Sequence, residues 1–212
     1  MKTMILIPCM DMLHTAFVRS LLLLDTNGHD ISYAFKAGSL VYDSRNQLLK
    51  MAKDANVDRL LWLDSDMDLP MNTLQRLSAD LDAGCEIVTG VYYKRKPPFT
   101  PTIYKECSIY QLQPDQLMPI ADPYLDYPED SLFNVEAFGF GCVLMTMDAV
   151  NKVTGELGMM PFMPVGGFGE DLSFCMRARQ CGIDLWCDSR VQCGHVGMYT
   201  YTEADYHGDG RT

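Results

Sequence analysis

The first half of the chain alternates short apolar runs with longer segments whose apolar residues recur at helical spacing. The runs predict four strands, at residues 3–7, 31–35, 59–63 and 86–89. The helical stripes predict three helices between them, at residues 12–24, from about residue 43 or 44 onward, and at residues 70–82. Pro8 is expected to close the first strand, and Pro70 to take the first position of the third helix. This alternation predicts a single α/β domain with a mostly parallel central sheet and helices on both faces.

The second half of the chain is less regular. Residues 92–130 contain seven prolines and six tyrosines, which disfavours regular helices and predicts either a working loop or lid, or a solvated insertion. Further strands are expected at residues 135–147 and 183–187, and further helices at residues 148–153 and 170–180. The residues from 199 onward are polar, so we expect a mobile tail and give His207 little weight.

The charge of the chain restricts its partners. A formal net charge of −11 and a pI of about 4.6 disfavour broad binding to nucleic acid or to an anionic membrane. The run Lys94-Arg95-Lys96 is a local basic exception. No apolar run is long enough for a secretion signal or a membrane span, so we expect a cytoplasmic protein. The eight cysteines are expected to be reduced thiols that lie mostly in the core.

Three acids follow the apolar run at residues 59–63 directly, namely Asp64, Asp66 and Asp68. In an extended chain such residues point the same way, and ligands bind beyond the carboxyl ends of strands in open α/β sheets. Oxygen-rich clusters of this kind suit Mg²⁺ or Mn²⁺ bridged to substrate phosphates. Loop solvation or helix capping explains these acids about as well. A helix-loop-helix calcium site is excluded, because its required Gly and Glu positions hold Leu69 and Gln75.

Four further features have both a structural and a functional interpretation. Arg45 is expected in the first turn of a helix, where it is either solvated or placed for an anion. Glu170 and Asp171 at a helix start are either capping residues or functional acids. Gly139 and Gly141 flank Phe140 in a predicted strand and allow something to approach the backbone closely. His195 lies in a glycine-rich segment, which favours a ligand or acid/base role.

Taken in order along nearly the whole chain, these segments resemble a GT-A glycosyltransferase of the family-2-like kind, which includes small stand-alone enzymes of phages and bacteria. Ile5-Leu-Ile-Pro-Cys9 is similar to the opening strand and nucleotide-contacting loop, and Ser44-Arg-Asn46 to the family's Ala/Ser-Arg-Asn helix start. Asp64-Ser-Asp66 matches the Asp-x-Asp motif, and Gly169-Glu-Asp171 the Glu-Asp motif. His195 matches the late histidine that joins the metal.

The resemblance implies a Rossmann-like GT-A domain at residues 1–198, with a nucleotide-binding half at 1–90, an acceptor and catalytic half at 91–198, and a tail at 199–212. It implies a hexosyl- or pentosyltransferase that uses a nucleotide-diphosphate sugar, with a UDP-sugar favoured. The nucleotide sugar would contact the residues Pro8, Cys9, Arg45, Asp64, Ser65 and Asp66. Asp66 and His195 would hold Mn²⁺ or Mg²⁺, with Asp64 as a further possible ligand, and Asp64 would hydrogen-bond the ribose.

For the chemistry, the resemblance implies that Asp171, rather than Glu170, takes the proton of the acceptor hydroxyl, and we expect inversion. The Pro- and Tyr-rich segment, together with Gly139, Phe140 and Gly141, would shape the acceptor site. The acceptor is either a saccharide or small glycoside, or a hydroxymethylated base in phage-type DNA, in which case the enzyme would work in the host cytoplasm. No oligomeric state follows from these motifs.

Two rival functions stay open. A sugar nucleotidyltransferase would share the sheet and the metal acids, but residues 8–13 contain neither the Gly nor the Lys of its usual phosphate loop. A non-catalytic sugar-binding module would not need both the metal acids and the Glu-Asp pair.

Overall fold

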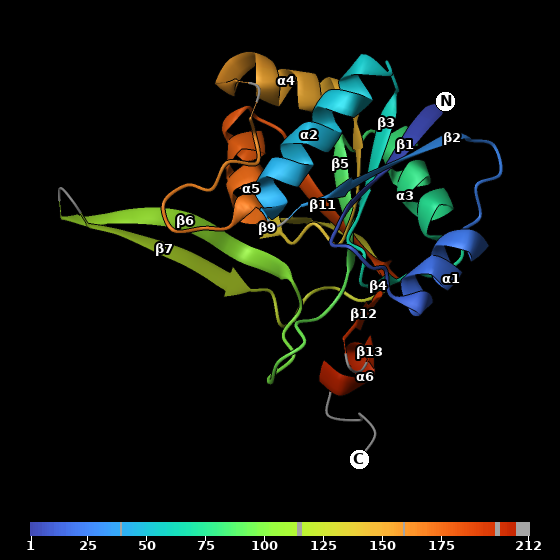
Figure 1. Ribbon diagram of the computed structural model, residues 1–212. Helices are drawn as coiled ribbons and strands as arrows, with labels where there is room; N and C mark the ends of the chain where they lie inside the picture. The colour runs from blue at the N-terminus through green and yellow to red at the C-terminus, as the bar shows by residue number, and fades with distance from the viewer. Residues whose placement is uncertain (39, 114–115, 159, 198–199, 207–212) are drawn as a thin grey trace.

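The computed structural model describes residues 1–38, 40–113, 116–158, 160–197 and 200–206. Within these residues a seven-stranded sheet forms the centre of the molecule, in the order β2-β1-β3-β10-β5-β11-β8 (Figure 1). Its strands are β1 (Lys2–Cys9), β2 (Asp30–Ala37), β3 (Arg59–Leu63), β5 (Ile87–Val91), β8 (Leu132–Val135), β10 (Cys142–Thr146) and β11 (Leu185–Gln192). Only β10 and β8 run against the others, so the sheet is mixed but mostly parallel, as predicted.

Helices cover both faces of this sheet (Figure 1). They are α1 (Thr15–Leu23), α2 (Val41–Asp54), α3 (Thr73–Asp82), α4 (Met147–Leu157) and α5 (Glu170–Gln180). The even-numbered side chains of β1, such as Leu6, pack in one core with α2, α4 and α5. The odd-numbered ones, such as Ile5 and Ile7, pack in a second core with α1 and α3. The predicted α/β architecture is therefore confirmed. In the described part of the chain, no helix is long and apolar enough to cross a membrane.

Several element boundaries differ from the prediction. Strand β1 continues through Pro8. The backbone groups of even-numbered residues in β1 face β3, and the pairing with β3 ends at Leu6. Proline at position 8 therefore removes no hydrogen bond from the sheet. Helix α1 begins at Thr15, three residues after the predicted start at residue 12. Helix α2 begins at Val41, which places Arg45 in its second turn. Helix α3 begins at Thr73 after Asn72, so Pro70 lies outside it.

The largest difference lies in the middle of the sheet. The predicted strand at residues 135–147 is divided among β8, β9 (Ala137–Phe138) and β10. Strand β10 runs antiparallel between β3 and β5, two strands that the chain order alone would place side by side.

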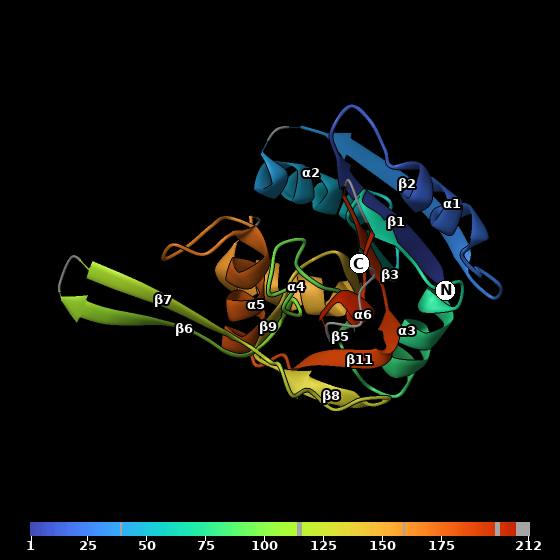
Figure 2. The ribbon, with the colours of Figure 1, turned by 90° about the horizontal axis from the view of Figure 1, so that it is seen from below.

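The Pro- and Tyr-rich segment forms mostly a β-hairpin rather than a loop. Strands β6 (Ile103–Gln113) and β7 (Gln116–Pro123) pair antiparallel and project from the body of the molecule (Figures 1 and 2). The base of β6 also pairs with β9, so β7 is the edge of a three-stranded sheet. Pro119 and Pro123 are tolerated there because an edge strand has one side without ladder hydrogen bonds.

The C-terminal segment is more regular than predicted. Strand β12 (Gly194–Val196) pairs with both β4 (Met67–Asp68) and β13 (Thr200–Tyr201), and a short helix, α6 (Glu203–Tyr206), follows. The ring of Tyr206 stacks on Tyr93, with 5.3 Å between ring centroids. Residues 200–206 therefore include regular secondary structure that the sequence did not predict, and His207 lies outside the described residues.

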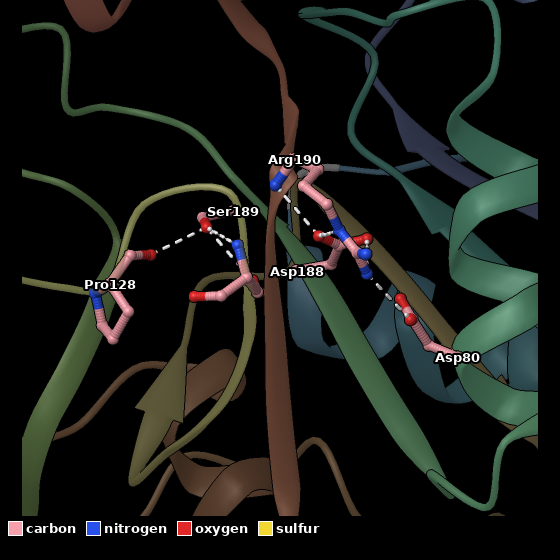
Figure 3. Close-up of polar contacts among 6 residues, drawn as sticks. Asp80, Pro128, Asp188, Ser189 and Arg190 are labelled. Carbon is pink, nitrogen blue, oxygen red and sulfur yellow. Dashed lines mark hydrogen bonds and ion pairs between the residues drawn. The ribbon is translucent and has the colours of Figure 1, made fainter.

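An ionic cluster of two buried acids and the exposed Arg190 ties β11 to α3 (Figure 3). The guanidinium of Arg190 donates to Asp188 on its own strand and to Asp80 on α3. Burial and the neighbouring Asp188 raise the pKa of Asp80 to about 6. None of these three residues lines the pocket described below, and we assign them a structural role. Seven of the eight cysteines are buried and none forms a disulfide, which confirms their predicted place in the core.

Candidate active site

A pocket of about 240 Å³ opens at the carboxyl ends of β1 and β3. Its lining contains seven residues that the sequence singled out: Pro8, Cys9, Arg45, Asp64, Ser65, Asp66 and Glu170. Residues from four separate segments therefore meet at the edge of the sheet where open α/β folds bind ligands. The lining also includes Met10, Gly38, Val41 and Ser44, which sequence reasoning did not assign to the site.

Arg45 is buried in the wall of this pocket, with 2% of its side chain exposed. Its Nη2 donates to Asp64 Oδ1 at 2.8 Å, and its Nε donates to Glu170 Oε1 at 3.2 Å. The guanidinium also lies over the rings of Trp62 and Phe140. Burial lowers the pKa of Arg45, but the two carboxylates outweigh it and the net shift is upward. Arg45 is therefore not solvated, and the anions that it meets are two side chains of the protein itself.

Replacing Arg45 by methionine should lower the free energy of unfolding by about 3 kcal/mol, because two partly buried carboxylates lose their shared counter-charge. The exposed pair Lys50–Asp54 offers a matched control, since its side chains are 71% and 65% exposed. Lys50→Met should cost less than about 1 kcal/mol. Urea unfolding at neutral pH measures both values, and equal losses in the two variants would contradict the role given to Arg45.

Asp64 and Asp66 line the same pocket but point to different partners. The chain turns after β3, where the Met67 N–H donates to the Asp64 carbonyl at 3.2 Å, so residues 64–66 are not extended. Asp64 pairs with Arg45, and burial raises its pKa although Arg45 opposes the shift. Asp66 pairs with His195 and Arg95. Asp64 and Asp66 therefore line one pocket, where Asp66 helps to raise the pKa of Asp64, although the two carboxylates bind different partners. The ion pair that Asp64 forms with Arg45 argues against Asp64 as a metal ligand.

The pairing of β12 with β4 brings His195 to Asp66. His195 Nε2 lies 3.4 Å from Asp66 Oδ2, and the Val196 N–H donates to the Asp66 carbonyl at 2.7 Å. His195 Nδ1 lies 2.7 Å from the Tyr93 carbonyl, which can only accept, so Nδ1 carries a proton and Nε2 is directed at the carboxylate. Burial alone would raise the pKa of Asp66, but His195 and Arg95 together lower it.

This pair meets the requirements of a divalent-metal site in part. No group of three His, Cys, Asp or Glu side chains with metal-binding geometry occurs among the described residues, so protein atoms alone do not complete a coordination shell. A carboxylate and an imidazole whose second nitrogen is fixed by a backbone carbonyl form a usual ligand pair. Mg²⁺ and Mn²⁺ commonly take their other ligands from water and substrate phosphates. Asp66 and His195 therefore fit such an ion, provided that the Arg95 side chain moves away from Asp66 Oδ2.

The third acid of the run, Asp68, has a structural partner. Its carboxylate accepts from Arg19 Nη2 on α1, at 3.3 and 3.4 Å to its two oxygens. This contact ties α1 to β4, and Asp68 does not line the pocket.

Glu170 and Asp171 open helix α5 after Gly169, as predicted. Glu170 faces the pocket and binds Arg45, whereas Asp171 Oδ1 accepts from the Leu172 N–H at 2.7 Å. Burial and the neighbouring Glu170 raise the pKa of Asp171 to about 6, which outweighs this hydrogen bond and the charge of Arg45. With this pKa, Asp171 is still mostly ionised at neutral pH.

The segment Gly139-Phe140-Gly141 is buried and does not present an open acceptor surface. A Cβ atom added at Gly139 would lie 2.1 Å from the Tyr92 hydroxyl, and one at Gly141 would lie 2.7 Å from the same ring. The Gly141 N–H donates to the Tyr92 hydroxyl at 3.2 Å, and Phe140 is 1% exposed. The close approach that these glycines permit is therefore that of Tyr92, and we do not place the acceptor on these three residues.

Sequence reasoning missed three residues that shape the site. The ring of Tyr92 meets His195 edge-on at 5.3 Å, and the Tyr93 carbonyl fixes its Nδ1. Arg95 Nη1 lies 3.0 Å from Asp66 Oδ2 and donates to the Val196 carbonyl at 3.1 Å. All three follow the carboxyl end of β5, a parallel strand, and that position is the signal that could have identified them.

No protein-family model matches this sequence, and no curated protein matches it. Among solved structures, the fold is similar to the crystal structure of A197 from STIV, with a TM-score of 0.66 and 18% sequence identity. The match covers 93% of this chain and 86% of that chain. Nearly the whole chain therefore shares its α/β fold with that viral protein.

Proposed function

We propose that this protein is a metal-dependent GT-A glycosyltransferase, which moves a sugar from a nucleotide-diphosphate sugar, with a UDP-sugar favoured, to a hydroxyl acceptor with inversion. One observation carries the proposal. Asp66, Asp64 and Glu170 line one pocket at the carboxyl ends of β1 and β3, where Arg45 joins Asp64 to Glu170 and His195 pairs with Asp66 from outside the lining. Ligands of open α/β sheets bind at this place.

The donor would lie in the pocket with its diphosphate toward Asp66. Mn²⁺ or Mg²⁺ held by Asp66 and His195 would supply Lewis-acid stabilisation of the leaving diphosphate. Asp64 would accept a hydrogen bond from the ribose, and the nucleotide would contact Pro8, Cys9 and Ser65 in the wall of the pocket. Through its Nε and Nη2, Arg45 would hold Asp64 and Glu170 in position, and its Nη1, which has no hydrogen-bond partner among the described residues, would be the group left to contact the nucleotide or its phosphates.

Asp171 would act as the general base. It would take the proton of the acceptor hydroxyl as that oxygen bonds to the anomeric carbon and the bond to the diphosphate oxygen breaks. A single displacement of this kind inverts the anomeric configuration. A base is most effective when its pKa lies near the working pH, and the raised pKa of Asp171, about 6, meets that condition.

The acceptor that we favour is a saccharide or small glycoside. A hydroxymethylated base in DNA is the second candidate, and it depended on the basic run at residues 94–96. In the structure Arg95 pairs with Asp66, and Lys94 lies over the ring of Tyr104. All three side chains of the run are nevertheless exposed, so the preference for a saccharide depends on the net charge of −11, which disfavours a duplex outside this one patch.

Transfer should weaken as the pH falls through about 6, because protonated Asp171 cannot accept the proton of the acceptor. Activity falls with the pH because the active form of the base is the carboxylate, which is the main form only above the pKa of Asp171. A profile of kcat against pH under saturating metal measures this effect. The residual activity of Asp171→Asn should lack the same inflection, and an unchanged profile in that variant would assign the inflection to another group.

A panel of nucleotide sugars with Mn²⁺ tests the proposal against its rivals. We expect one donor to release a nucleoside diphosphate. Pyrophosphate released from a nucleoside triphosphate and a sugar phosphate would instead indicate a sugar nucleotidyltransferase. Saturable sugar binding with no turnover of any donor would indicate a non-catalytic sugar-binding module.

A further inference from the structure

Strand β2 is one edge of the central sheet and pairs only with β1 among the described residues (Figure 2). The Asp30 N–H donates to the Met1 carbonyl and the Gly38 N–H to the Cys9 carbonyl, so even-numbered residues of β2 face β1. The backbone groups of Ile31, Tyr33 and Phe35 therefore face outward, away from the sheet.

This edge has neither a bulge nor a proline, two of the usual protections against pairing, and its charged residues are Asp30 and Lys36. All eight residues of β2 keep an unbroken register with β1, without a bulge, and none of them is proline. The side chains of Tyr33 and Phe35 are 49% and 46% exposed. A regular, open edge strand with exposed aromatic side chains is a template for another strand.

The sequence of β2 is complementary to itself in one antiparallel register. If a two-fold axis passes through Tyr33, that residue faces its own copy, and Ile31 faces Phe35. Each of these outward residues then exchanges two backbone hydrogen bonds with the residue opposite. In the same register Asp30 lies opposite Lys36 of the other copy in a non-hydrogen-bonded pair, in which the side chains are closer together. The two-fold axis repeats this pair, so two pairs of opposite charges form.

Neighbouring registers do not share this property. Any axis through a residue of β2 places odd-numbered residues opposite odd-numbered ones, so outward-facing groups can meet in several registers. An axis through Ser32 places Asp30 opposite Ala34, and an axis through Ala34 places Lys36 opposite Ser32. An axis through Phe35 places Lys36 opposite Ala34, and an axis through Ile31 places Asp30 opposite Ser32. The shifts to Phe35 and to Ile31 also shorten the overlap of the two strands.

We propose that β2 is a homodimer interface, at which a second copy of this chain pairs antiparallel about Tyr33 and continues the seven-stranded sheet across the two-fold axis. Two copies that each carry a net charge of −11 repel one another over most of their surface. The paired segment itself has one acid and one base, so this edge allows contact without like charges opposite each other. Because both copies use the same surface, the interface is isologous, and the assembly stops at two copies.

Sedimentation velocity of the full chain over a range of concentrations tests the proposal. We expect dimers of the wild-type chain at about 50 µM, and about tenfold weaker association for Lys36→Asp and for Asp30→Lys, because each places like charges opposite one another twice. Lys152→Asp on α4 changes the net charge as Lys36→Asp does, on an exposed residue outside the interface, and should leave association unchanged. A wild-type chain that stays monomeric would overturn the proposal, as would equal effects of Lys36→Asp and Lys152→Asp.

Charge exchange tests the register itself. The double variant Asp30→Lys/Lys36→Asp should regain the wild-type association, and a mixture of the two single variants should form mixed dimers in preference to either homodimer. Tyr33→Pro removes an N–H that faces away from β1, so it should abolish association and keep the native circular dichroism spectrum. Failure of both the double variant and the mixture to restore association would contradict the axis through Tyr33.

Discussion

Asp66→Asn should lower nucleotide-sugar turnover about a hundredfold or more, which corresponds to losing about 3 kcal/mol of transition-state stabilisation. The amide keeps the shape of the side chain but removes the charge that would hold a divalent ion against His195. His195→Ala should have an effect of similar size, because Nε2 is the other protein ligand directed at this position. Steady-state release of nucleoside diphosphate at saturating donor measures both losses.

Asp68→Asn is the matched control for this prediction. It makes the same chemical change two residues away, at a carboxylate that binds Arg19 and lies outside the pocket. Its turnover should stay within about twofold of the wild type, since an exposed ion pair contributes little. Equal losses in Asp66→Asn and Asp68→Asn, or full wild-type activity in excess chelator, would show that Asp66 does not hold a catalytic metal.

The second large effect is expected at Asp171. Asp171→Asn should reduce sugar transfer roughly a thousandfold, because the general base is removed. Binding of the donor should survive, since Asp171 does not line the pocket and Arg45 keeps its partners Asp64 and Glu170. We therefore expect a fall in kcat with little change in the KM for the donor. Asp148→Asn, an exposed acid in the first turn of α4, is a control that should leave both constants unchanged.

The stereochemistry of the product tests the same role. With Asp171 as the base in a single displacement, the first-formed product should have the anomeric configuration opposite to that of the donor. Proton NMR of the reaction at early times measures this configuration. Retention would contradict the role of Asp171 as the base of an inverting transfer.

The parts of the fold that sequence predicted are those that depend on local patterning. Leu48 and Leu74 lie in helical stripes that do pack into the two cores, and the run at residues 59–63 is a fully buried strand. The insertion of β10 between β3 and β5 was not predictable in this way, because the choice of neighbour depends on tertiary packing. The hairpin of β6 and β7 was missed because its prolines were counted without knowing that β7 is an edge strand.

The composition of the candidate site was predicted better than its geometry. Asp64 and Asp66 were placed correctly at the end of β3, but the turn that separates their side chains is set by backbone contacts with Gly141 and within the loop. The pairing of Arg45 with Asp64 and Glu170 joins residues 19 and 125 positions apart, and no local pattern reports such a contact. The roles of Tyr92, Tyr93 and Arg95 likewise depend on where β12 brings His195.

The measurement that tests the central claim most directly is a calorimetric titration of UDP into the wild-type chain and into His195→Ala, each with Mn²⁺ and with excess chelator. It requires neither the acceptor nor turnover. We predict saturable binding of UDP to the wild type that depends on Mn²⁺, and about tenfold or more weaker binding to His195→Ala in the presence of the metal. UDP binding that is equal with and without Mn²⁺, or equal in the two proteins, would contradict a nucleotide site built on a metal held by Asp66 and His195.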